Sequence, residues 1–159
     1  FGEVDNEQLN WKPNPETWSI AQNIDHLIVV NESYFQNFDK IKRGTYKTPF
    51  PSKINFLVSF LGNTILKAVK PDRKKKMKTF SVWNPTNSEI KKGMLDRFKQ
   101  NQEELKDLIL NSKDLVENGA VISSPANKYL VYKVETAFEI IVTHAQRHYE
   151  QAKEVYLEM

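Results

Sequence analysis

The stretch "VETAFEIIVTHAQRHYEQAKEV", residues 134–155, decides the fold class of this chain. At about 100° per residue its apolar side chains fall on one stripe, which is the pattern of a helix that packs against a core. Two histidines, His144 and His148, lie inside or beside that stripe. Because they are four residues apart, their imidazoles project from one side of the helix, one turn above each other. This spacing lets both side chains reach a single metal ion.

Three other segments also have helical periodicity. Ser19 and Gln22 can form a capping box that opens a helix over about 19–41, and this helix carries the third histidine of the chain, His26. A largely buried helix is expected over about 53–69, and a third long helix within 88–112. Four amphipathic helices and only 5 glycines predict an all-α protein, a four-helix bundle, in a single domain that spans residues 1–159.

The segments outside these helices are less regular. Residues 117–133 are interpreted as a connection before the last helix. The opening "FGEVDNEQL", residues 1–9, is typical of the end of a helix, so we expect the N-terminal helix to be truncated. The basic cluster within 67–78 is interpreted as a solvated loop. It could instead form a collar that attracts an anionic thiol or, as the less favoured alternative, contact the phosphate backbone of a nucleic acid.

The composition excludes several kinds of site and partner. The chain has no cysteine, which excludes a disulfide framework, a thiolate metal site and a cysteine nucleophile, and fits the cytoplasm. No apolar run approaches the roughly 20 residues that cross a bilayer, so we expect a soluble protein with no membrane partner. A formal net charge of +3 is too small to predict binding to nucleic acid.

The histidines are the strongest functional signal. All three of them, His26, His144 and His148, are expected to point inward from two long helices, and a buried imidazole without a partner costs free energy. Neutral imidazole ligands suit Zn, Ni, Fe or Mn, while hydrogen-bonded core histidines are the alternative. The residue after His144 is Ala145 and not the glutamate of a zincin, so a metalloprotease is excluded.

Two motifs carry a family resemblance. "W-S-I-x5-H-L" at residues 18–27, together with "H-A-Q-R-H-Y-E-Q" at residues 144–151, resembles the DinB/YfiT-like superfamily. The resemblance implies a four-helix bundle with an open three-histidine divalent-metal site, a histidine triad formed here by His26, His144 and His148. Gln151 also fits the pattern of the family.

The resemblance also implies a function. Characterised members include maleylpyruvate isomerases and thiol-dependent S-transferases, which use glutathione, mycothiol or bacillithiol. We therefore expect a transferase that joins a low-molecular-weight thiol cosubstrate to a small-molecule substrate. The alternatives are a metal-dependent hydrolase, in which water replaces the thiol, and a non-enzymatic, stress-related module that binds a metal or a small ligand. Related bundles often dimerise, so a homodimer is an option, although no apolar stripe in the sequence identifies an interface.

Residues near the histidines are given structural roles. Arg147 and Gln151 could meet an anionic substrate, but helix-surface positions are the preferred interpretation for both. Asp25 precedes His26 but is turned about 100° away from it, so we do not expect it to orient that imidazole. Seven large aromatic residues could line a pocket above the metal, but core positions are the preferred interpretation for all of them, namely Trp11, Trp18, Phe50, Phe56, Phe60, Phe80 and Trp83.

Overall fold

The structure, a computed structural model, describes residues 4–72, 79–86 and 93–159. These residues form six α-helices, two short 3₁₀ helices at Phe50–Lys53 and Ser81–Trp83, and one antiparallel hairpin of β1 (Val121–Ser124) and β2 (Asn127–Lys133). The chain is therefore predominantly helical, as the sequence predicts. The α-helices are α1 (Asn6–Asn10), α2 (Ile20–Lys42), α3 (Asn55–Ala68), α4 (Met94–Leu110), α5 (Lys113–Glu117) and α6 (Val134–Glu158).

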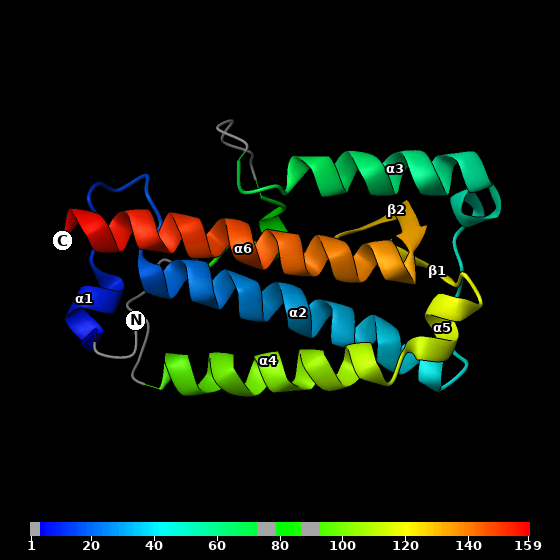
Figure 1. The fold of residues 1–159 in the computed structure, drawn as a ribbon, viewed down its shortest axis with the longest axis horizontal. Coiled ribbons are helices and arrows are strands. Elements are labelled where there is room, and N and C mark those ends of the chain that lie inside the picture. The colour runs from blue at the N-terminus through cyan, green and yellow to red at the C-terminus, as the bar shows by residue number, and fades with distance from the viewer. Residues whose placement is uncertain (1–3, 73–78, 87–92) are drawn as a thin grey trace.

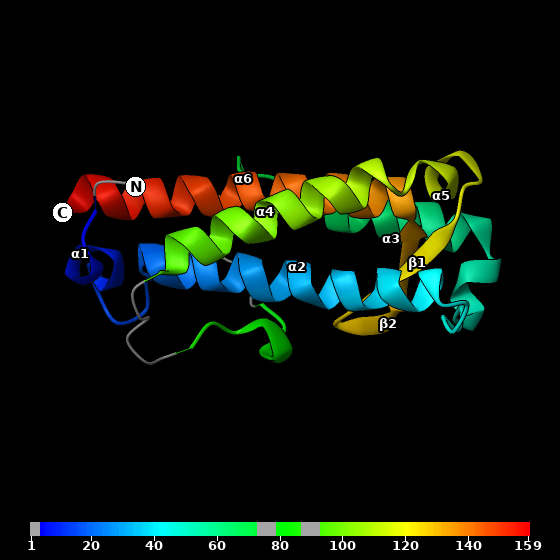
Figure 2. The same cartoon turned by 90° about the horizontal axis from the view of Figure 1, so that it is seen from below.

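Four long helices lie alongside one another, with α2 and α6 antiparallel in the middle (Figure 1). α4 packs against α2, and α3 packs against α6 and the strand β2. Figure 2 shows α4 running obliquely across the pair formed by α2 and α6. Side chains on the facing sides of α2 and α6 are therefore the ones that the fold brings together from distant parts of the sequence. None of the helices in these described ranges has the length and apolar character needed to cross a membrane.

The two helices that carry the histidines begin where the sequence predicts. The Ser19 hydroxyl accepts a hydrogen bond from the Gln22 backbone N–H at 3.1 Å, and the Gln22 side chain accepts one from the Ser19 N–H at 3.2 Å. This capping box fixes the first turn of α2. α6 begins at Val134, also as predicted. The third predicted helix is α4, whose described part begins at Met94, while residues 87–92 lie outside the described residues.

The predicted connection over 117–133 contains the β-hairpin, which the sequence analysis missed. Ile122 of β1 is opposite Tyr132 of β2, and both side chains are buried together with Val131. β-Branched and aromatic residues favour strands, but the two runs here are short and read as a loop. The hairpin packs against α3 and provides part of the main core.

α3 is a helix as predicted, but it is not largely buried. Only Val58 and Gly62 of this helix are buried, while Phe56 and Phe60 are 73% and 55% exposed. The reason is that α3 lies at the edge of the helix set, with α6 and β2 packed on one side of it. At Gly62 a Cβ atom would lie 3.0 Å from the Cβ of Tyr132, so glycine allows the close approach of α3 to the hairpin.

The described N-terminal residues form one short helix, α1. A capping box between Asp5 and Gln8 fixes its start at Asn6. The truncation of the N-terminal helix stays a prediction. Residues 1–3 lie outside the described residues. Leu9 of α1 packs into a small apolar cluster with the start of α2 and the end of α6.

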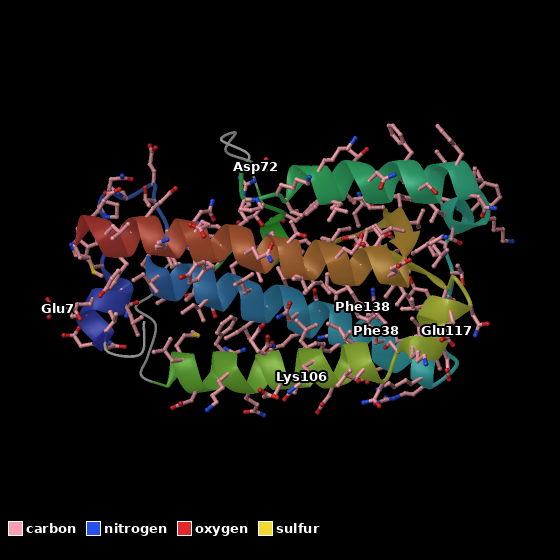
Figure 3. All side chains as sticks on the ribbon, viewed as in Figure 1. Glu7, Phe38, Asp72, Lys106, Glu117 and Phe138 are labelled. Atoms are coloured by element: carbon pink, nitrogen blue, oxygen red, sulfur yellow. The ribbon has the colours of Figure 1, made fainter. Side chains whose placement is uncertain are left out.

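The main apolar cluster lies toward the hairpin end of the molecule. Phe38 of α2 and Phe138 of α6 stack there with ring centroids 5.3 Å apart, and Figure 3 labels both side chains. The histidine positions on α2 and α6 fall between this cluster and the smaller one at the other end. A layer of buried polar residues therefore separates two apolar regions.

Candidate metal centre

The three histidines predicted as ligands lie together at the interface of α2 and α6. Nε2 of His144 is 3.0 Å from Nε2 of His148 and 3.4 Å from Nε2 of His26. One nitrogen of each of these residues lies within 4.8 Å of the others, and His26 and His148 are buried. Helical spacing places His144 and His148 on one face of α6, and the antiparallel packing brings His26 to them.

The ring of His26 is oriented by a backbone carbonyl from a different part of the chain. Nδ1 of His26 lies 2.7 Å from the carbonyl oxygen of Trp83. A carbonyl oxygen only accepts hydrogen bonds, so Nδ1 carries the proton and Nε2 of the neutral ring has a free lone pair. The Trp83 indole N–H donates to the Ser33 hydroxyl at 3.1 Å, which ties this short 3₁₀ helix to α2.

The ring of His148 is oriented by a side chain that the sequence analysis missed, Asn23. Nδ1 of His148 donates to Oδ1 of Asn23 at 2.8 Å, while Nδ2 of Asn23 donates to the carbonyl oxygen of Ser19 at 2.9 Å. The second hydrogen bond fixes the orientation of the amide, so its oxygen faces the imidazole. The available signal was a polar residue three positions before His26, on the same face of α2.

These hydrogen bonds leave the facing nitrogens in an arrangement that suits a cation. Nε2 of His26 and Nε2 of His148 both present lone pairs to Nε2 of His144, which carries at most one hydrogen. One N–H cannot fully satisfy two acceptors, whereas a cation accepts all three lone pairs. Tetrahedral coordination with metal–nitrogen bonds of about 2.0–2.1 Å puts ligand atoms roughly 3.3 Å apart, close to the observed 3.0 and 3.4 Å.

Burial keeps the three imidazoles neutral. It lowers the pKa of His144 to about 3, with the charges of His26 and Arg147 as smaller causes. The pKa of His148 is lowered well below its usual range, again chiefly by burial. Burial also lowers the pKa of His26, although the hydrogen bond to Trp83 and the charge of Asp25 act in the opposite direction. Neutral imidazole is the form that binds a metal ion, so the three side chains are in the state that metal binding requires.

Comparison with known families agrees with this geometry. The family model of the DinB superfamily matches residues 1–152. The chain belongs to the DinB superfamily. The resemblance carried by the tryptophan–serine and histidine motifs is thereby confirmed. No match was found among the curated proteins or the solved structures.

A large cavity adjoins the three histidines of this DinB-superfamily chain. Its volume is about 840 Å³, and it lies among α2, α3, α6, the hairpin and residues 79–84. Trp18 stacks on His148 along its wall, with ring centroids 5.7 Å apart and planes 16° apart. A cavity of this size can hold a small-molecule ligand next to the histidines.

The aromatic residues interpreted as core have mixed positions. Trp83 packs against the main apolar cluster, as expected, and also lines the cavity. Trp18 and Phe80 line the cavity as well, because the segments before α2 and before α4 contribute to its wall. The interpretation as core was wrong for the exposed residues, namely Trp11, Phe50, Phe56, Phe60 and Phe80.

The charged and polar neighbours also have defined positions. Arg147 donates to the carbonyl oxygens of Ala68 at 3.2 Å and Lys70 at 3.3 Å, so it joins α6 to the end of α3 while lining the cavity. Gln151 lines the cavity as well, and neither residue is simply on the helix surface. Asp25 accepts a hydrogen bond from the Thr86 N–H at 3.3 Å. Of the basic cluster, Lys67 and Lys70 are exposed, and residues 73–78 lie outside the described residues.

Proposed function

We propose that this protein binds a divalent cation through His26, His144 and His148 and is a thiol-dependent S-transferase. The observation that carries the proposal is the convergence of three neutral imidazole nitrogens beside a cavity. Membership of the DinB superfamily supports the same chemistry. The donor set suits Zn, Ni, Fe or Mn.

The residues of the chain have separate roles in this proposal. A divalent cation held by three neutral imidazoles keeps its full positive charge and lowers the pKa of a thiol or water at its open positions. Asn23 and the carbonyl of Trp83 hold two of the rings in the tautomer that exposes Nε2. Arg147 places a positive charge on the cavity wall, where an anionic group of a thiol cosubstrate would be attracted. The thiol must be a cosubstrate, because the chain has no cysteine.

We also propose that the four long helices are a variant of the four-helix bundle, within a single domain. The packing of α2 against α4 and α6, and of α3 against α6, supports this assignment. The insertion of the hairpin beside α3 is the feature in which this arrangement differs from a simple bundle.

The first experiment measures bound metal in the purified protein by elemental analysis. Near-stoichiometric metal is expected in the parent and in Gln146→Ala, which alters an exposed position of α6. It should be lost in His26→Ala and His148→Ala while circular dichroism shows that the helices persist. A parent that carries no metal and takes up none from added Zn, Ni or Mn would exclude the metal site and, with it, the enzyme.

The second experiment separates the reactions. The metal-loaded protein is assayed with glutathione, mycothiol or bacillithiol and a model electrophile, and thioether formation that depends on His144 supports the transferase. Ester or amide cleavage without a thiol would support a hydrolase instead. Stoichiometric metal with neither activity would leave a non-enzymatic binding module.

A further inference from the structure

The cavity extends well beyond the histidines. Its wall follows α6 from Ile140 to Glu158, which is about 27 Å at 1.5 Å per residue. On α2 the lining residues are Asn23, His26, Val30 and Tyr34, each about one turn after the last, so Tyr34 lies about 12 Å along the helix from His26. The part of the cavity between the histidines and the hairpin is called the inner limb here. Its wall includes Val30, Tyr34, Ile65, Leu130, Tyr132 and Ile141.

The inner limb differs chemically from the rest of the cavity. Four described residues with charged side chains line the cavity, and they lie level with the histidines or farther from the hairpin. These residues are Glu16, Arg147, Glu154 and Glu158. The inner limb has mostly apolar side chains along its length, with Thr64 on its α3 side, and the almost fully buried Tyr34 and Tyr132 at its end. A charged group would lose its hydration there without gaining a counter-ion, whereas an apolar group gains free energy by leaving water.

The end of the inner limb is a small network of hydroxyls. The Tyr34 and Tyr132 hydroxyls are hydrogen-bonded at 2.5 Å, and Ser124 hydrogen-bonds to Tyr132. Burial raises the pKa of the Tyr132 phenol to about 12 and raises that of Tyr34, so both stay protonated at neutral pH. Hydroxyl protons can turn, so this network can donate to a ligand carbonyl or accept from a ligand hydroxyl.

We propose that the inner limb binds an uncharged, elongated and mostly apolar substituent of the electrophilic substrate, which ends in one neutral hydrogen-bonding group that meets Tyr34 and Tyr132. The assignment to the electrophile rests on the proposed function. The binding site itself rests on the cavity, its apolar wall and the hydroxyl pair. The reactive end of such a molecule would lie at the histidines, and its neutral end would lie at the phenols at the other end of the inner limb.

The test measures binding of simple alcohols to the protein as purified and again after treatment with a chelator. Isothermal titration calorimetry with 1-butanol, 1-pentanol and 1-hexanol should show affinity that increases roughly fourfold for each added methylene. This readout needs neither metal nor thiol. Absence of transfer activity with the chain-length dependence intact would therefore overturn the proposed function and not the inner limb.

Two neighbouring residues of β2 give a matched pair of variants. Leu130 lines the inner limb, whereas the adjacent Tyr129 is exposed on the opposite face of the strand. Leu130→Trp fills the limb and should weaken 1-hexanol binding about tenfold or more. Tyr129→Trp should change it by no more than about twofold. Parental affinity in a folded Leu130→Trp, or equal affinities for 1-butanol and 1-hexanol, would overturn the proposal.

The hydroxyl pair is tested by comparing an alcohol with a similar chloride. Tyr34→Phe and Tyr132→Phe should each weaken 1-hexanol about fivefold, the worth of one neutral hydrogen bond, and leave 1-chlorohexane unchanged. Use of both variants keeps the test valid if one of them fails to fold. If the ratio of the two affinities is unchanged in the folded variants, the phenols do not recognise the polar end and the proposal fails.

Discussion

Two buried regions on the same pair of helices are held together in opposite ways. Phe38 and His26 both lie on α2 and are each only 1% exposed, and both face residues of α6. The Phe38–Phe138 stack gains free energy from the apolar surface that it removes from water. In the histidine layer, burial instead removes water from three imidazoles, and the hydrogen bonds to Asn23 and Trp83 replace only part of the lost hydration. The first region stabilises the fold, whereas the second costs stability that a bound cation would restore.

Lowering the pH should have the largest effect on stability, and it should act through the histidine layer and not through the apolar region. In chelator-treated protein, burial holds the pKa of His144 at about 3, against about 6.5 in the unfolded chain. Between these values the unfolded state binds a proton that the folded state does not, so stability is lost as pH falls. The free energy of unfolding should drop by about 4 kcal/mol from His144 alone between pH 6.5 and pH 3.

Urea unfolding followed by circular dichroism over this pH range measures that loss. His144→Leu removes one group that takes up a proton on unfolding. The slope of the free energy of unfolding against pH should therefore fall by up to roughly 1.4 kcal/mol per pH unit. Phe38→Leu should keep the parental dependence, since it touches only the apolar region. A parent whose stability does not change below pH 6.5 contradicts the proposed difference.

Truncation in the apolar region should have the next largest effect on stability and none on metal content. Phe38→Ala is expected to lower the free energy of unfolding by about 3–5 kcal/mol, because it leaves a cavity beside Phe138. Val142→Ala, at an exposed position of α6, should cost less than about 0.5 kcal/mol. Loss of bound zinc in a folded Phe38→Ala would show that the two regions are not separate.

Added zinc should stabilise the protein only when the histidine layer is intact. Free zinc at about 100 times its dissociation constant should raise the free energy of unfolding of the parent by about 2.7 kcal/mol. His26→Phe should show no such increase, because it removes one of the three converging nitrogens. Thermal unfolding with and without zinc gives the measurement, and equal stabilisation of parent and variant would place the zinc elsewhere.

The smallest expected effects come from the two buried asparagines of α2, which separate a role in zinc binding from a role in stability. Asn23→Ala should weaken zinc binding about 10- to 100-fold, since it releases the ring of His148. Asn31 is also buried, but its side chain donates to Asn101 of α4 at 2.7 Å. Asn31→Ala should therefore lower stability while zinc affinity, measured by competition with a chelating dye, stays within about twofold of the parent. Equal losses of affinity in both variants would assign Asn23 a general structural role.

The parts of the structure that the sequence predicts are those with a local signal. The capping box at Ser19 and the periodicity of residues 134–155 define α2 and α6, and the spacing of His144 and His148 defines two of the three histidines of the candidate site. The other features depend on contacts between distant segments. The Trp83 carbonyl reaches His26 from an irregular segment without periodicity, and the exposure of Phe56 follows from the place of α3 at the edge of the fold.

The separation of His26 and His144 in sequence has a consequence for the topology of the chain. They are 118 residues apart, yet their Nε2 atoms lie 3.4 Å from each other. A cation shared by them would act as a cross-link that closes most of the chain into a loop. Closing a loop of about 100 residues restricts the unfolded state by on the order of 5 kcal/mol in the chain-entropy treatment. In a protein without cysteine, such a link would be opened by a chelator or by acid and would be indifferent to reducing agents.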